Sequence, residues 1–212
     1  FMVHPEAINT FVYSIGIAII TTLVCLILGY PAAYILAHRH FNVSRTMVVL
    51  FILPIWVNIL IRTLATVALF DFLNLPLGED ALVFGMVYNF LPFMVLPIYN
   101  VLIKIDRDVI NAARDLGANS VQTFLKVTLP LTTPGIVSGI TMVFVPSLTT
   151  FVISDLLGGS KILLIGNVIE QEFTKGSNWN LGSGLSLVLM VFILISMALI
   201  AKYDKNGEGS TF

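Results

Sequence analysis

The stretch Asn111-Ala112-Ala113-Arg114-Asp115-Leu116-Gly117 decides the fold, because it is a patterned polar segment set between long apolar runs. Nine residues separate Gly117 from the sequence Val127-Thr128-Leu129-Pro130, which closes the segment. Apolar side chains recur at helical spacing over Val109–Leu116, namely at Val109, Ala112, Ala113 and Leu116. This spacing predicts a short amphipathic helix between two much more apolar parts of the chain.

The residues that follow carry signals for ending one helix and beginning the next. Gly117 is predicted to end the first helix, since glycine readily adopts the left-handed conformation that closes many helices. Asn119 and Gln122 have the spacing of a capping box, which predicts a second short helix over Ser120–Lys126. Pro130 suits the first turn of the next helix, where no backbone donor is needed.

The composition places the chain in a membrane. Hydrophobic residues make up 57% of it and charged residues only 11%, and the mean hydropathy is +0.96. Soluble domains are about 25% charged. The net charge of -1 argues against a nucleic-acid-binding surface. The single cysteine, Cys25, lies in an apolar run without companion metal ligands, so we expect neither an intramolecular disulfide nor a metal site.

Five apolar runs are long enough to cross a bilayer, which takes about 20 helical residues. They cover Thr10–Leu36, Met47–Phe70, Leu82–Ile103, Leu131–Ile153 and Ser183–Ala201. We therefore predict an all-α integral membrane protein in which residues 1–212 form one domain, with long connections at 104–130 and 154–180. Pro146 is predicted to break or strongly bend the fourth span.

The distribution of Lys and Arg predicts the topology. Loop 38–45, loop 104–126 and the tail from Lys202 together hold eight of these residues, whereas the remaining loops hold only Lys161 and Lys175. By the positive-inside rule, the 104–130 connection and the C-terminus are predicted to be cytoplasmic. The segments 71–80 and 154–180 are then predicted to face outward.

The 111–130 segment resembles the conserved loop of permease subunits of bacterial ABC importers, which has the pattern Glu-Ala-Ala, three residues, Gly, nine residues, Ile-x-Leu-Pro. Asn111 stands in place of the Glu and Val127 in place of the Ile. The resemblance implies a type I importer permease fold in which this loop is a coupling helix that docks on a cytoplasmic ATPase. The residues implied in coupling are Asn111, Ala112, Ala113, Asp115, Gly117, Leu129 and Pro130. The alternative is a plain loop of helical character between two membrane helices.

Other segments resemble the spermidine/putrescine branch of this family. They are Leu28–Pro31, Leu91–Pro97, Ser154–Gly159 and Leu164–Ile169. The resemblance implies a polyamine importer in the bacterial inner membrane, with a second permease subunit, two ATPase subunits that carry the ATP and Mg, and an extracytoplasmic polyamine-binding protein. This chain would be a transport subunit without enzyme activity or a cofactor of its own. Family members usually have six membrane helices, so a further helix is expected before Phe1.

Other functions remain as alternatives. The chain could be the permease of an importer for a different small solute, or an ion channel, which would need no coupling helix. An integral membrane enzyme is disfavoured, because the sequence has no convergent set of titratable groups and no phosphate-binding glycine loop.

Phe151, Ser154 and Asp155 are the candidate residues of the substrate path. They follow the fourth span within the branch-like segment, and polyamine ammonium groups interact with carboxylates and aromatic faces. Seven acidic residues against two lysines on the predicted outer side would suit a cation. Alternatively, the acids only reflect the topology, and Asp155 caps a helical turn or pairs with Lys161.

Arg62 is the one basic residue predicted within a span. On a straight helix it would lie roughly 24 Å beyond Thr46, close to the outer interface. There it could snorkel to water or form a structural ion pair. A role at an outer gate is the alternative.

Overall fold

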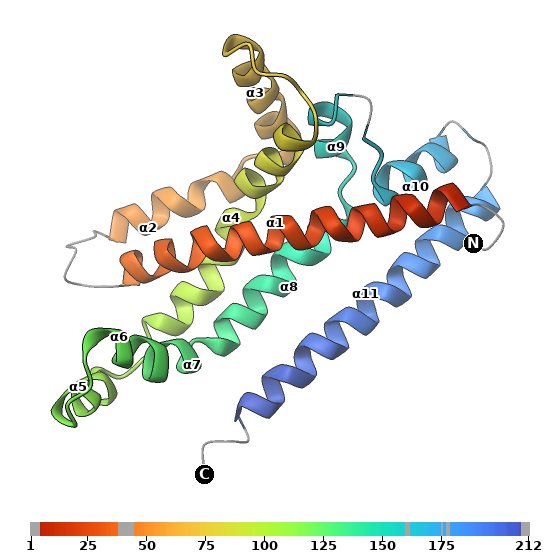
Figure 1. Cartoon of the computed structure of the whole chain (residues 1–212). Coiled ribbons are helices and arrows are strands. Elements are labelled where there is room, and N and C mark those ends of the chain that lie inside the picture. The colour runs from red at the N-terminus through yellow and green to blue at the C-terminus, as the bar shows by residue number, and fades with distance from the viewer. Residues whose placement is uncertain (1–4, 38–44, 160–161, 175, 177–178, 209–212) are drawn as a thin grey trace.

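The computed structural model describes residues 5–37, 45–159, 162–174, 176 and 179–208, and this part of the chain consists of helices joined by turns and loops, without strands (Figure 1). The membrane-embedded elements are α1 (Pro5–Ala37), α2 (Arg45–Ile52), the 3₁₀ turn η2 (Leu53–Trp56), α3 (Ile59–Phe72), α4 (Glu79–Leu102), α8 (Thr133–Thr149) and α11 (Trp179–Glu208). The 104–130 connection holds α5 (Arg107–Asp115), α6 (Ser120–Thr123), the π-helical turn η3 (Phe124–Thr128) and α7 (Leu129–Leu131). The segment after α8 holds α9 (Val152–Leu157) and α10 (Ile165–Thr174).

Three of these helices, α1, α4 and α11, are each long and apolar enough to cross a membrane, and two bent helix pairs bring the number to five if each pair counts as one span. On that count, the described residues agree with the predicted five. The prediction of one continuous span over Met47–Phe70 is wrong, however, because the chain bends by 100° between η2 and α3. Pro54 lacks an N–H for the helical ladder. Asn58 then starts a new helix by accepting a hydrogen bond from the Leu60 N–H at 2.8 Å.

The fourth span is interrupted, but not where Pro146 predicts. Pro146 lies within the last turn of α8, and the Thr150 N–H still donates to its carbonyl at 2.9 Å. The chain leaves the helix at Thr150, whose backbone is extended, and resumes at Val152. A second bend of 61° separates α8 from the helical turns before Thr132. The fourth span is thus a broken helix, and its two breaks lie at Thr132 and at Thr150, not at Pro146.

The core forms where α1, α4 and α8 pack together. Met94 on α4 fills the space left by two glycines, Gly29 on α1 and Gly139 on α8. A Cβ at Gly139 would lie 2.7 Å from the Met94 sulfur and 3.2 Å from its carbonyl oxygen, so a larger residue there would require Met94 to shift. Over an apolar 18-residue window, 61% of α4 is buried, against 33% for α1 and 11% for α11. The central helix is therefore α4, and α11 lies at the periphery.

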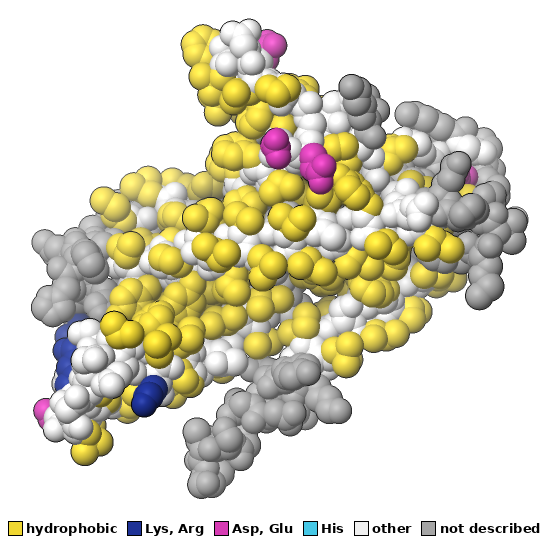
Figure 2. Space-filling model, viewed as in Figure 1, with side chains coloured by type: hydrophobic (Ala, Val, Ile, Leu, Met, Phe, Trp, Pro, Cys, Tyr) yellow, Lys and Arg dark blue, Asp and Glu magenta, His cyan; other side chains and the backbone are white. Residues whose placement is uncertain are grey.

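The two ends of the bundle differ in charge. In Figure 1, α5–α7 lie at one end and α9 and α10 at the other. Four exposed basic side chains belong to the connection between α4 and α7: Lys104, Arg107, Arg114 and Lys126. Figure 2 shows Lys and Arg side chains in dark blue at the end that holds α5–α7. Apolar side chains cover most of the visible surface between the two ends. This arrangement is typical of a protein that spans a membrane.

Candidate functional site

The α5 helix ends in a Schellman motif built on Gly117. The Ala118 N–H donates to the Ala113 carbonyl at 3.0 Å, and the Gly117 N–H donates to the Arg114 carbonyl at 2.8 Å. Gly117 has φ +88°, in the left-handed region that disfavours side chains. The predicted helix and its glycine stop are confirmed, although α5 begins at Arg107, two residues before Val109.

The predicted capping box is also present. The Asn119 side chain accepts from the Gln122 N–H at 2.8 Å, and the Gln122 side chain accepts from the Asn119 N–H at 3.0 Å. Helix α6 is shorter than predicted, because the chain passes at Phe124 into the π-helical turn η3. Pro130 lies in the first turn of α7, as predicted.

An aromatic clamp attaches this segment to α1. The Phe124 ring meets Tyr30 and Tyr34 edge-on, with centroid distances of 5.8 Å and 5.6 Å. The hydroxyl of Tyr30 lies 3.0 Å from that of Thr132, which begins α8. The clamp therefore joins η3 to α1, and Tyr30 joins α1 to the start of α8. A displacement of the α5–α6 segment would be transmitted to the core through these contacts. Sequence reasoning missed it, because α1 and Phe124 are distant in sequence.

The α5 helix has no buried residue. Leu116 is 89% exposed and Val109 46% exposed, so most of the apolar face of this strongly amphipathic helix is uncovered. Among the predicted coupling residues, Ala113 and Leu129 are half-buried, and the others are exposed: Asn111, Ala112, Asp115, Gly117 and Pro130. An amphipathic helix with an open apolar face at the polar end of a membrane protein is suited to docking on another protein.

At the opposite end, side chains satisfy the backbone where α8 breaks. The buried Asn167 donates through Nδ2 to the Phe151 carbonyl at 3.2 Å and accepts from the Leu164 N–H at 3.1 Å. Gly166 lies against the carbonyls of Thr149 and Thr150, where a Cβ would come within 2.7 Å and 2.9 Å of the oxygens. At membrane depth, broken helices are tolerated where protein or a water-filled cavity satisfies their backbone. The pair Gly166-Asn167 within an apolar segment was a sequence signal for these contacts, but the sequence-based predictions did not use it.

The three predicted path residues lie in different surroundings. Ser154 is fully buried and donates to the Ile162 carbonyl at 3.0 Å, which ties α9 to the segment before α10. Asp155 is exposed in the first turn of α9. The N-cap residue of this helix is Phe151, and no side-chain hydrogen bond caps the helix there. The alternative partner of Asp155, Lys161, lies outside the described residues.

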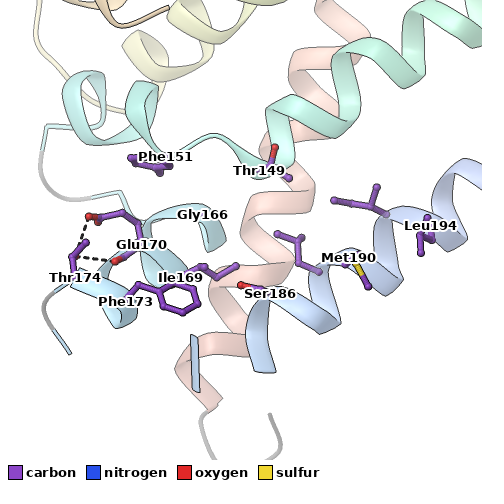
Figure 3. A pocket seen from close by; sticks show the side chains of 12 residues that line it. Thr149, Phe151, Gly166, Ile169, Glu170, Phe173, Thr174, Ser186, Met190 and Leu194 are labelled. Atoms are coloured by element: carbon purple, nitrogen blue, oxygen red, sulfur yellow. Dashed lines mark hydrogen bonds between the residues drawn. The ribbon is translucent and has the colours of Figure 1, made fainter. Parts of the chain in front are cut away.

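Phe151 is 42% exposed and lines a groove of about 570 Å³ between the end of α8, α10 and α11 (Figure 3). The groove is mostly apolar, and among the described residues that line it Glu170 on α10 supplies the one carboxylate. In Figure 3, Glu170 faces Thr174, whose hydroxyl donates to the Glu170 carboxylate at 3.0 Å. The structure thus brings Phe151 together with Glu170, and neither Ser154 nor Asp155 lines this groove.

Arg62 does not lie near the outer interface, because the bend before α3 invalidates the straight-helix distance. Its side chain is 7% exposed, and Nη1 donates to the Asn89 carbonyl at 3.4 Å. Asn89 is ten positions after Glu79 in the 24-residue helix α4, so this contact lies near the middle of the span. Within the described residues, no group of three or more His, Cys, Asp or Glu could hold a metal ion.

Residues 26–205 match the family described as "Binding-protein-dependent transport system inner membrane component". The chain is similar to the spermidine/putrescine transport system permease protein PotB of Haemophilus influenzae, with 38% identity over 91% of this chain and 73% of that protein. It is 39% identical to the PotB protein of Escherichia coli K12, over 90% of this chain and 75% of that protein.

The fold is similar to that of a chain in an inward-facing structure of the MetNI methionine ABC transporter. The TM-score is 0.68 at 19% identity, over 97% of this chain and 96% of that one. This likeness confirms the predicted importer permease fold. The matched sequence spans most of the chain, and the chain belongs to the family of inner membrane components of binding-protein-dependent transport systems.

Proposed function

We propose that this chain is a permease subunit of an ATP-driven importer of polyamines of the spermidine and putrescine class. The observation that carries the proposal is the identity of 38–39% to spermidine/putrescine permeases over about nine-tenths of the chain. The chain forms part of the membrane path, and ATP hydrolysis takes place on a partner subunit that binds the ATP and Mg.

The proposed assembly contains a second permease, two cytoplasmic ATPase subunits and an extracytoplasmic polyamine-binding protein in a bacterial inner membrane. Two observations support it. The uncovered apolar face of α5 is suited to a groove on an ATPase. The exposed basic residues between α4 and α7 favour a cytoplasmic position for that end, and with it the C-terminus.

Phe151 and Asp155 remain the proposed substrate-path residues. Phe151 presents an aromatic face in a groove with one carboxylate, and Asp155 presents an exposed carboxylate beside the break in the fourth span. Buried Ser154 is assigned a positioning role, since its hydrogen bond holds α9 in place. A polyamine alternates ammonium groups with methylene segments, which suits a path that offers carboxylates and apolar walls in turn.

The test is uptake by the complete transporter reconstituted in vesicles with its binding protein. We expect ATP-dependent accumulation of labelled spermidine, competed by unlabelled putrescine and not by methionine. A complex that assembles and hydrolyses ATP, but neither accumulates a polyamine nor is stimulated by one, would reject the polyamine assignment. It would favour an importer of a different small solute.

The Asp155→Asn variant tests the path assignment, because it removes the charge and keeps a polar side chain of the same shape. We expect spermidine uptake at low substrate concentration to fall at least about tenfold, since hydrogen bonds to charged groups contribute about 1.5–3 kcal/mol. Asp71→Asn is the matched control, because Asp71 is an exposed acid at the far end of α3. Unchanged uptake and unchanged polyamine-stimulated ATPase activity in Asp155→Asn would contradict the assignment.

A further inference from the structure

We propose that Arg62, at the bend between η2 and α3, binds a carboxylate from a membrane helix of the second permease subunit. The proposal rests on the proposed function in two respects: a second permease is present, and the transported solute is a cation, which does not bind Arg62 itself.

The guanidinium of Arg62 is short of hydrogen-bond acceptors. Among the described residues its one hydrogen bond, from Nη1 to the Asn89 carbonyl, is long at 3.4 Å, and Nε is buried without a partner there. Guanidinium has five N–H donors, and burying them unpaired at membrane depth is costly. The Asn89 side chain does not relieve the shortage, since its Oδ1 is also unpartnered.

The electrostatic surroundings of Arg62 call for a negative charge. Arg62 lies in the first turn of α3, where the helix dipole adds partial positive charge. The oxygen of the Asn58 side chain is already used by the Leu60 N–H. The acids of the adjoining helix α4, Glu79 and Asp80, are in its first turn, roughly 14–15 Å along the helix from Asn89. Within the described part of the chain, Arg62 forms no ion pair, and a carboxylate from another molecule would supply the counter-charge.

A cavity gives such a group access to Arg62. It has a volume of about 410 Å³ and is lined by the bend between η2 and α3, including Trp56, Val57 and Arg62, and by Phe90 and Phe93 of α4. Trp56 is 84% exposed and Val57 44% exposed, so the cavity opens on the outside of this subunit. A side chain from a neighbouring helix can enter there without displacing a helix of this chain.

The depth of the cavity and the substrate charge leave one occupant. Lipid phosphates lie at the bilayer surface, roughly 15 Å from the middle of a span where Arg62 contacts α4. A cationic polyamine is repelled by both the guanidinium and the helix N-terminus. A carboxylate on a helix of the second permease carries the required charge at the required depth, and its two oxygens match the planar fork of arginine.

The test is a double-mutant cycle on the complete importer, purified through a tag on this chain. Arg62→Met removes the charge at similar length, and Arg62→Glu reverses it. Each Asp or Glu in the membrane helices of the second permease is changed to Leu and, separately, to Arg. The readouts are the amount of second permease that copurifies and the melting temperature of the assembly. Both readouts work without substrate.

We expect Arg62→Glu to lower copurification of the second permease at least tenfold. One acid-to-Arg change in that subunit should restore it, and the same acid changed to Leu should partly rescue Arg62→Met. If Arg62→Glu does not insert, the Arg62→Met cycle alone decides. The proposal is overturned if Arg62→Met retains the second permease at the wild-type level and melting temperature, if no acid position couples to Arg62, or if Arg62→Met loses only a bound anionic lipid. Failure of any second permease to copurify with the wild type would instead reject the proposed function.

Discussion

Replacing Gly117 by valine is expected to abolish uptake while the protein remains folded and inserted. Gly117 has φ +88°, and a β-branched residue there costs about 1–2 kcal/mol or more. The helix would relieve the strain by giving up the Schellman hydrogen bonds that end α5, which changes the angle at which its apolar face is presented. Because α5 has no buried residue, the membrane core would not be affected. The measurements are ATP-driven uptake in vesicles and the amount of inserted protein.

Two variants separate backbone strain from side-chain size. Ala118→Val places the same valine side chain at the next residue, where φ is not positive, and should keep most of the uptake. Gly117→Asn should also retain activity, because asparagine tolerates the left-handed region better than other residues do. Wild-type coupling between ATP hydrolysis and uptake in Gly117→Val would exclude this role of the turn.

Truncating Phe124 to alanine is expected to uncouple ATP hydrolysis from transport. The variant removes two edge-to-face ring contacts, to Tyr30 and Tyr34, each worth about 0.5–1.5 kcal/mol beyond area burial. Helix α5 and the capping box keep their own hydrogen bonds, so the ATPase should still bind. Movement of the docked segment would no longer reach α1. We expect basal ATPase activity to persist, while substrate-driven uptake falls at least about tenfold.

The controls for Phe124 distinguish the clamp from general loss of aromatic surface. Phe72→Ala removes a ring of the same size that is 82% exposed, and should leave uptake near the wild-type level. Tyr30→Phe keeps the ring contact but loses the hydroxyl that lies 3.0 Å from that of Thr132, so an intermediate effect is expected. Parallel loss of ATPase binding and uptake in Phe124→Ala would show that Phe124 supports docking itself rather than the transmission of movement.

Features that depend on hydrogen bonds between near neighbours could be predicted from the sequence. The Gly117 stop, the Asn119–Gln122 box and Pro130 in a first turn each involve residues within about one helical turn. The approximate extents of α1, α4 and α11 were also predictable, because a bilayer demands long apolar runs. Residue chemistry alone decides these features, with little contribution from distant parts of the chain.

Features that depend on distant contacts could not be predicted in the same way. Hydropathy is continuous through Met47–Phe70, and a proline alone does not distinguish a kinked helix from two helices at 100°. The depth assigned to Arg62 was wrong as a consequence. At Pro146, the helix continues for most of a turn and ends only where Gly166 and Asn167 of α10 meet the chain. The hydrogen-bond partner of the buried Ser154, the Ile162 carbonyl, likewise lies eight residues away in another segment.

The contrast in burial between α4 and α11 has a consequence for biosynthesis. The Trp179–Ile200 part of α11 is strongly apolar and only 11% buried, so it can partition into lipid on its own as it leaves the translocon. Helix α4 carries Asn89 and two prolines and needs α1 and α8 to cover it. Since α1, α4 and α8 are all translated before α11, the core can close while α11 is still being synthesised. The groove beside Phe151 receives its α11 wall last, and so does the apolar cluster of Ala18, Leu148 and Ile165 that Leu189 of α11 completes. A chain that ends before Trp179 would therefore keep the α1–α4–α8 contacts and lack both.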